Sequence, residues 1–219
     1  MIREKLREIR EKIEKACGRA QRDPAEVRLV LITKNVSVDR IREAFDAGIR
    51  DFGENRVQEL LEKKPRLPPE IRWHFVGSLQ TNKVKDLLGE AVLLHSLDRT
   101  PLAHEIQKRA AQRNLTVAAL LQVNIAGEAT KSGFSPAEAE KAFGELREFS
   151  QIRIRGLMTI GPLTEDLKKV RESFRALRLL RDALGLWELS MGMSSDFEIA
   201  VEEGATILRI GTAVFGERK

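Results

Sequence analysis

The sequence predicts a (β/α)8 barrel, a single α/β domain over residues 1–219 with one extra helix in front. A chain of 219 residues is long enough for one sizeable core and short for two full domains. Short β-rich runs recur along it, and a helical pattern follows each run without a long linker or low-complexity stretch. A doubly wound open sheet is the alternative that this alternation leaves open.

The elements follow one another at regular intervals. Residues 1–22 form an amphipathic pattern whose charges recur with a helical period, and we expect this helix to pack on the barrel. Eight expected strands come next, over residues 27–33, 48–52, 71–76, 91–97, 116–124, 152–158, 186–190 and 206–210.

Several helix boundaries carry recognisable signals. Ser135 and Glu138 have the spacing of a capping box, with Pro136 at the first helical position. Gly48 and Gly89 lie where two of the helices should end, because glycine readily adopts the left-handed conformation that closes a helix.

Composition argues against several classes of function. The 38 Lys and Arg residues are interspersed with 33 Asp and Glu residues, so no basic tract suggests nucleic acid binding. The single cysteine, Cys17, excludes an internal disulfide, and with only three histidines no metal-ligand spacing appears. The charged N-terminus lacks the apolar core of a signal peptide, and no apolar run could span a membrane. We therefore expect a cytoplasmic protein without bound metal.

Polar residues gather where the strands should end, which is where functional groups collect in this barrel class. In chain order they are Lys34, Gly53–Asn55, His74 with Gly77–Ser78, Ser96 with Asp98, Asn124, Met158–Thr159, Met191–Ser195 and Arg209–Thr212.

Lys34 has the parity of Val30 and Ile32, which places it on the expected inner face of the first strand. Apolar walls there would favour the neutral amine that a carbonyl compound needs to form an imine. From this position alone, a solvated lysine at a strand end is the favoured interpretation.

The loops after the seventh and eighth strands favour a ligand-binding role for Lys34 instead, since this pair of loops often binds phosphate in barrels. Ser194 and Ser195 precede a helical pattern, so hydroxyls and amides face a place suited to a dianion. Gly211 and Thr212 let the backbone approach from the other side. The alternative role for the serines is to cap that helix, and both roles can hold.

Two further residues lie inside the expected barrel. Arg209 would be costly to bury unpaired, so we expect an anionic or hydrogen-bond-accepting partner in the barrel mouth. His74 has the parity of Val76, opposite Trp73 and Phe75, and a hydrogen-bonded core histidine is favoured over a ligand contact.

These residues occur within strings that closely resemble the pyridoxal phosphate homeostasis protein family, also called the YggS/PROSC family. The resemblance covers residues 27–216, nearly the whole chain. The strings that carry it are DFGENRVQE, WHFVGSLQTNKVKDLL, LLQVNIAGEATKSGF, GLMTIGPL and LSMGMSSDFEIAVEEGATILRIGTAVFG.

The resemblance implies a fold similar to the barrel domain of alanine racemases, with pyridoxal 5′-phosphate (PLP) joined as a Schiff base to Lys34. It also implies phosphate contacts from Ser194, Gly211 and Thr212, an arginine facing the pyridine nitrogen at Arg209, and an asparagine near the ring at Asn55. One departure stands out: family members usually read Lys-Thr-Lys-Pro around the lysine, whereas this chain reads Thr33-Lys34-Asn35-Val36, so the cofactor lysine is retained but any role of the second lysine is in doubt.

The function that the resemblance implies is PLP homeostasis, with storage or delivery to apo-enzymes, no strong turnover and no dedicated catalytic residue. We expect a monomer that binds neither nucleic acid nor membrane. A PLP-dependent amino-acid racemase or lyase is the alternative, but the chain has no tyrosine to act as the opposing base, and we expect no second domain to enclose a substrate. An aldolase-type lysine imine with a sugar phosphate is a third possibility.

Overall fold

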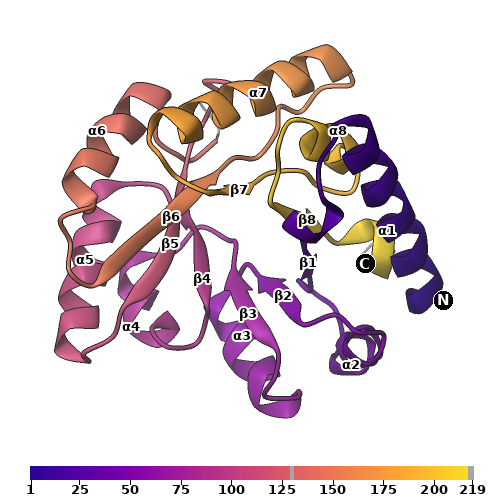
Figure 1. The fold of residues 1–219 in the computed structure, drawn as a ribbon. Helices are drawn as coiled ribbons and strands as arrows, with labels where there is room; N and C mark the ends of the chain where they lie inside the picture. Colours follow the sequence, from indigo (N-terminus) through magenta and orange to yellow (C-terminus); the bar gives the residue numbers. More distant parts are fainter. Residues whose placement is uncertain (129–130, 217–219) are drawn as a thin grey trace.

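Eight parallel strands close into a barrel in the computed structural model, which describes residues 1–128 and 131–216 (Figure 1). Each strand pairs with its sequence neighbours, and β1 pairs with β8. The predicted fold is therefore confirmed, and the open-sheet alternative is wrong. Residues 129–130 and 217–219 of the predicted domain lie outside the described part. The strands are β1 (Arg28–Ile32), β2 (Asp51–Glu54), β3 (Arg72–Phe75), β4 (Leu93–Leu97), β5 (Val117–Gln122), β6 (Ile152–Met158), β7 (Glu188–Ser190) and β8 (Ile207–Ile210).

A helix follows each strand and covers the outside of the barrel. In order these are α2 (Val38–Asp46), α3 (Val57–Lys63), α4 (Val84–Leu87), α5 (Thr100–Gln112), α6 (Pro136–Leu146), α7 (Leu167–Ala183), α8 (Phe197–Glu202) and α9 (Thr212–Phe215). The additional helix α1 (Ile2–Arg19) packs against α8 and α9, and Figure 1 shows it in indigo beside α8 and the C-terminal end. Its buried side chains recur every three or four residues, as burial of one helical face requires.

The predicted helix boundaries hold. The Ser135 side chain accepts a hydrogen bond from the Glu138 amide, and the Glu138 carboxylate accepts one from the Ser135 amide, so the capping box is confirmed. Gly48 and Gly89 follow the ends of α2 and α4 with φ values of +94° and +85°, the region that favours glycine.

Strand β2 differs from the prediction, which ended it at Phe52, because the observed strand continues through Glu54. Gly53 signals a loop in the sequence, but here it pairs with Ile32 inside the barrel. A Cβ atom at this position would lie 2.7 Å from Ile32 Cδ1 and 3.2 Å from Val30 Cγ1, so a side chain here would crowd two inward-facing residues of β1. The glycine at this position is therefore explained by close packing inside the barrel, since the residue does not lie in a turn.

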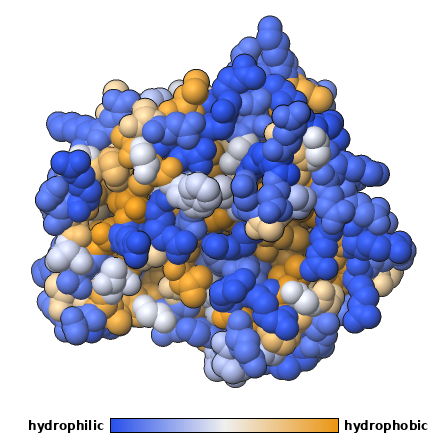
Figure 2. All heavy atoms as spheres, viewed as in Figure 1, coloured by the Kyte–Doolittle hydropathy of each residue, from blue (hydrophilic) through white to orange (hydrophobic). Residues whose placement is uncertain are grey.

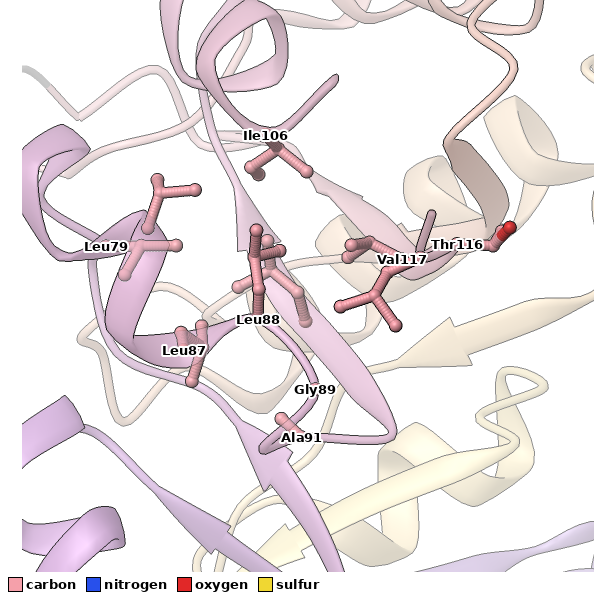
Figure 3. Close-up of a pocket in the computed structure, with 11 residues that line it drawn as sticks. Leu79, Leu87, Leu88, Gly89, Ala91, Ile106, Thr116 and Val117 are labelled. Atoms are coloured by element: carbon pink, nitrogen blue, oxygen red, sulfur yellow. The ribbon is translucent and has the colours of Figure 1, made fainter. Parts of the chain in front are cut away.

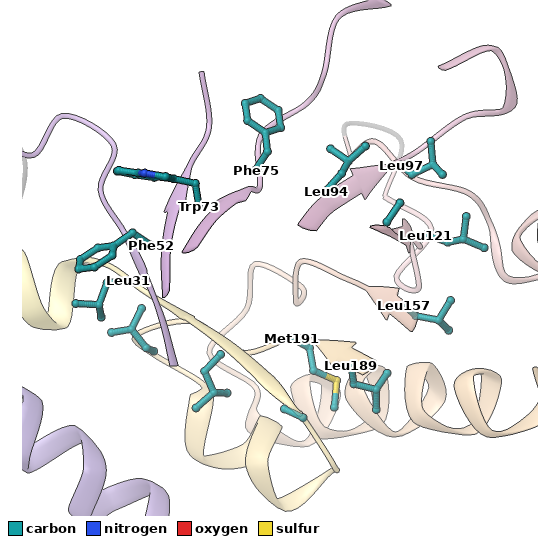
Figure 4. Close-up of a cluster of buried hydrophobic side chains, with 14 of the residues drawn as sticks. Leu31, Phe52, Trp73, Phe75, Leu94, Leu97, Leu121, Leu157, Leu189 and Met191 are labelled. Carbon is teal, nitrogen blue, oxygen red and sulfur yellow. The ribbon is translucent and has the colours of Figure 1, made fainter. Parts of the chain in front are cut away.

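Side chains alternate between two faces of the barrel wall. Those that point outward pack beneath the helices, as Figure 4 shows for Leu31, Phe52, Trp73, Phe75 and Leu157. The inward-facing apolar set is separate and small: Val30, Leu93, Leu120, Met158 and Ile207, with Ile32 and Ala118 partly buried against them. The rest of the interior is polar, which is unusual for a barrel whose lumen is normally packed with branched apolar residues.

One apolar pocket on the surface is unsuited to a charged ligand. This pocket lies beside α4 and α5 and is lined by Leu79, Leu87, Leu88, Ile106 and other residues without an ionisable group (Figure 3). Hydrophilic residues cover most of the face in Figure 2, with hydrophobic patches between them. Within residues 1–128 and 131–216, the helices are all too short or too polar to cross a membrane.

Candidate functional site

The predicted site residues lie together at the carboxyl ends of four neighbouring strands, in the order β7, β8, β1 and β2. The strand register fixes their relation: Val30 pairs with Arg209, and Ile32 pairs with Gly53. Lys34 lies two residues after Ile32, and Asn55 lies two residues after Gly53. One end of the barrel therefore brings together residues that are up to 178 positions apart, from Lys34 to Thr212 (212 − 34).

Lys34 occupies a tight turn directly after β1. Its side chain is half-buried, and within the described residues it makes no hydrogen bond or ion pair. The next residue, Asn35, has φ +56°, so the chain turns sharply on leaving the lysine. A lysine amine held at the barrel mouth without a partner is available to a ligand.

The residues on both sides of Lys34 are anchored by two carboxylates. Thr33 Oγ1 donates to Glu54 Oε1 at 2.6 Å, and the Asn35 amide donates to Glu59 Oε1 at 2.7 Å. These bonds come from β2 and α3, so the position of Lys34 depends on two elements that follow it in sequence.

Lys63, at the end of α3, joins these anchors. Its buried Nζ donates to Glu54 Oε1 at 2.7 Å, to Glu59 Oε1 at 2.6 Å and to the Thr33 carbonyl at 2.7 Å. Burial raises the pKa of Glu54, and the hydrogen bonds from Lys63 and Thr33 oppose that rise. The sequence did not reveal this cluster, since the spacing of Glu59 and Lys63 is that of an ordinary surface ion pair on a helix.

Replacing Lys63 with methionine should lower the free energy of unfolding by about 3–5 kcal/mol, because the buried Glu54 and the partly buried Glu59 would lose their cation. The loss should shrink as the pH falls. A carboxyl whose folded pKa is raised takes up a proton on folding, so its cost to stability is present above that pKa and is relieved below it. Chemical unfolding at several pH values measures both effects.

The neighbouring Lys64→Met is the matched control. Lys64 contacts Glu90 at 2.8 Å through side chains that are 38% and 34% exposed, so its loss should cost about 1 kcal/mol or less. Equal losses for the two variants would show that the cluster around Lys63 is not energetically special.

Asn55 follows β2 and is half-buried, and within the described residues its Oδ1 atom is buried without a hydrogen-bond partner. The loop that carries it lies against the next loop, since a Cβ atom on Gly77 would come within 2.1 Å of the Asn55 carbonyl. A buried acceptor without a donor is costly, so the Asn55 amide oxygen is available to a donor from a bound molecule.

The loops after β7 and β8 meet as predicted. Ser194 Oγ accepts a hydrogen bond from the Ala213 amide at 3.2 Å, so Ser194 lies beside Gly211 and Thr212 at the start of α9. Gly192 makes the turn possible with φ +93°, and a Cβ atom there would lie 2.6 Å from Ala200 Cβ. A hydroxyl and amide groups thus line one rim of the mouth.

Arg209 is buried, with only 6% of its surface exposed. Its Nη1 donates to Ser190 Oγ at 2.7 Å and its Nη2 donates to the Thr159 carbonyl at 2.8 Å, which confirms the expected acceptors. Burial lowers the pKa of Arg209 to about 10, with Asp196 opposing the change, so the group stays charged at neutral pH. Within the described residues no carboxylate forms an ion pair with it.

His74 is a hydrogen-bonded core histidine, as the sequence favoured. Its Nε2 lies 3.0 Å from Asp51 Oδ1, and its Nδ1 lies 2.9 Å from His95 Nε2. Trp73 and Phe75 point outward, as predicted from their parity. Val36, where the sequence departs from the family's usual pattern, is buried in the apolar cluster. The turn that carries Lys34 therefore contains no second lysine.

These groups suit one kind of ligand. An unpaired amine can bond an aldehyde, amide and hydroxyl groups can hold a phosphate, and a buried guanidinium can face an aromatic nitrogen that accepts hydrogen bonds. Within the described residues, no cluster of His, Cys, Asp or Glu could hold a metal ion.

Comparisons with known proteins match nearly the whole chain to one family. The family model described as "Alanine racemase, N-terminal domain" matches residues 5–219. A pyridoxal phosphate homeostasis protein of Aquifex aeolicus is 49% identical over 223 residues, which cover 99% of this chain and 98% of that protein. A second such protein, from Pseudomonas aeruginosa, is 40% identical over 220 residues, with coverage of 99% and 96%.

Two solved structures extend the comparison. PipY of Synechococcus elongatus PCC7942 with PLP bound superposes with a TM-score of 0.86 at 35% identity, covering 99% of this chain and all of that one. Alanine racemase from Corynebacterium glutamicum shares the fold, with a TM-score of 0.72 at 14% identity over 99% of this chain and 61% of that one.

Proposed function

This chain belongs to the family of pyridoxal phosphate homeostasis proteins, and on that premise we propose that it carries PLP as a Schiff base on Lys34. The observation that supports this most directly is the half-buried Lys34 amine, which has no partner within the described residues and lies in the turn after β1, the strand that pairs with the strand of the buried Arg209. A relative of the same size holds PLP in its structure, as its description states.

Each remaining site residue has a role in this proposal. Ser194, Gly211 and Thr212 hold the phosphate at the loops after β7 and β8, where the Ser194 hydroxyl already meets the start of α9. Asn55 supplies the acceptor that has no partner among the described residues. Arg209 faces the ring nitrogen from the floor of the mouth.

PLP supplies an electron sink for carbanions when its ring nitrogen is protonated. Arg209 has no acceptor atom, and its charge persists at neutral pH, so it cannot readily give that nitrogen a proton. The arginine therefore disfavours the protonated ring and weakens the sink. This favours a protein that stores, buffers or delivers the cofactor over one that turns over amino acids.

A racemase or lyase remains the competing function. The chain contains no tyrosine, so any second base at the mouth would have to be another residue type. We further propose that the protein acts as a monomer and passes PLP to apo-enzymes. We also propose that it acts in the cytoplasm, a location that the single buried cysteine, Cys17, supports.

An absorbance spectrum followed by an amino-acid screen tests the function. Protein loaded with PLP should be yellow, and turnover of each common amino acid should fall well below the usual enzymatic range of about 1–1000 per second. Rates inside that range would identify an enzyme. A colourless protein that instead forms a reducible adduct with a sugar phosphate would favour the aldolase-type site.

A further inference from the structure

A continuous chain of hydrogen-bonded side chains crosses the polar interior of the barrel, from the buried Arg209 at the mouth to the exposed Arg72 at the opposite end. Of its members, only Arg209 belongs to the proposed ligand site. The contacts in order are Arg209 Nη1 to Ser190 Oγ (2.7 Å), Ser190 Oγ to His95 Nδ1 (2.8 Å), His95 Nε2 to His74 Nδ1 (2.9 Å), His74 Nε2 to Asp51 Oδ1 (3.0 Å), and Asp51 to Arg72 Nε (2.9 Å) and Nη2 (2.5 Å).

The two ends of this chain determine the direction of every hydrogen bond within it. Arg209 has only donors, so Ser190 Oγ must accept from it, and the Ser190 proton is left for His95 Nδ1. An ionised Asp51 has only acceptors, so His74 Nε2 must carry a proton. The contact between the imidazoles is then satisfied when His95 Nε2–H donates to His74 Nδ1.

The charges of the groups agree with this single direction. Burial would raise the pKa of Asp51, but hydrogen bonds from His74 and Arg72 outweigh burial and lower the pKa to about 2. Burial lowers the pKa of His74, with Asp51 opposing it, and lowers the pKa of His95 strongly.

The other charged groups facing the two imidazoles do not change this outcome. Arg28 acts against protonation of both rings, Arg209 acts against protonation of His95, and Glu188 favours protonation of His74. Glu188 is itself paired with Arg28 and Arg155. Both imidazoles are therefore neutral at neutral pH and carry their protons on Nε2.

We propose that Ser190, His95, His74 and Asp51 are positioning residues that hold Arg209 as a donor at the mouth and direct every proton of the chain away from it. Ser190 donates inward, so the chain offers no acidic proton to a ligand at the mouth. A further consequence, that the PLP ring nitrogen stays unprotonated, rests on the proposed function. The direction of the chain itself does not depend on any ligand.

Nitrogen NMR of the full, ligand-free chain with 15N-labelled histidine tests the direction. Only three imidazoles contribute, and His104, which is exposed and lies 3.1 Å from Glu145, serves as an internal reference. We expect His74 and His95 to show a protonated Nε2, a bare Nδ1 and a coupling across the bond between the rings. A charged ring, or a proton on Nδ1 of either one at neutral pH, would overturn the proposal.

Asp51→Asn tests whether Asp51 sets the direction, because an amide can donate as well as accept. His95, two contacts away, should change from one tautomer to a mixture that includes Nδ1–H. Glu145→Gln is the matched control and should shift only His104. Ser190→Ala should preserve both Nε2–H tautomers, because Asp51 remains ionised.

The outcomes separate cleanly. A folded Asp51→Asn protein with unchanged His95 signals contradicts the role of Asp51, as does tautomer reversal in Ser190→Ala. If Asp51→Asn does not fold, the wild-type and Ser190→Ala spectra still decide the direction. Loading Asp51→Asn with PLP should change the pH dependence of its absorbance relative to the wild type. Confirmed tautomers in a protein that binds no PLP would refute the proposed function alone.

Discussion

Replacing Lys34 with alanine should abolish the covalent link to PLP, so that borohydride treatment leaves the mass of the protein unchanged. The reason is chemical, since alanine has no amine and Lys34 is the lysine at the end of β1 that has no partner within the described residues. Stability should change little, because no hydrogen bond or ion pair is lost. Intact-protein mass after reduction is the readout.

Lys131→Ala is the control for this variant. Lys131 also lies on a loop at the carboxyl ends of the strands, but its Nζ is bonded to Glu128 at 2.8 Å and to the Gly161 carbonyl at 2.9 Å. This variant should form the adduct as the wild type does. An adduct that persists in Lys34→Ala and disappears in Lys131→Ala would move the site to the other lysine.

Arg209→Glu should have the second large effect, on both stability and the spectrum of bound PLP. A buried carboxylate would replace a cation opposite the Thr159 carbonyl, near Asp196, so the free energy of unfolding should fall by about 3–5 kcal/mol. Because burial would favour the protonated carboxyl, the new side chain could share a proton with the ring nitrogen. The absorbance of bound PLP should shift, and slow transamination should increase.

Arg153→Glu makes the same exchange on the exposed side of β6 and should leave the spectrum unchanged. Unfolding curves and absorbance of the two variants at equal PLP concentration provide the comparison. If a folded Arg209→Glu protein has the wild-type spectrum, Arg209 does not contact the ring.

The sequence predicted the fold because the barrel is encoded locally. Each strand and helix carries its own periodicity, and capping signals such as Ser135 and Glu138 act within a single turn. Strand β2 shows the limit of this reasoning. Sequence alone predicts a loop at Gly53, whereas in the structure this residue lies within β2 and faces the side chains of Ile32 and Val30 on the adjacent strand.

Part of the candidate site could be predicted, because its residues lie at or just after the carboxyl ends of strands. Lys34, Asn55, Ser194 and Arg209 were found from position, parity and family resemblance, and the structure brings them to one end of the barrel. Their roles toward PLP remain predictions.

The groups that support the site could not be foreseen, because their contacts are distant in sequence. Lys63 reaches Thr33 across 30 residues, and Ser190 meets His95 across 95 residues. No local pattern marks a lysine that will be buried between two carboxylates. For the histidines, the inward parity of His74 was visible, but its partner on β4 required the register of the barrel.

In the proposed function one lysine, Lys34, carries PLP at the mouth of the barrel. Peptide mapping by mass spectrometry of wild-type protein, loaded with PLP and then reduced, tests it most directly. We expect a single pyridoxyl phosphate group on the peptide that contains Lys34. A modification confined to any other peptide, or no modification at all in excess cofactor, would contradict it.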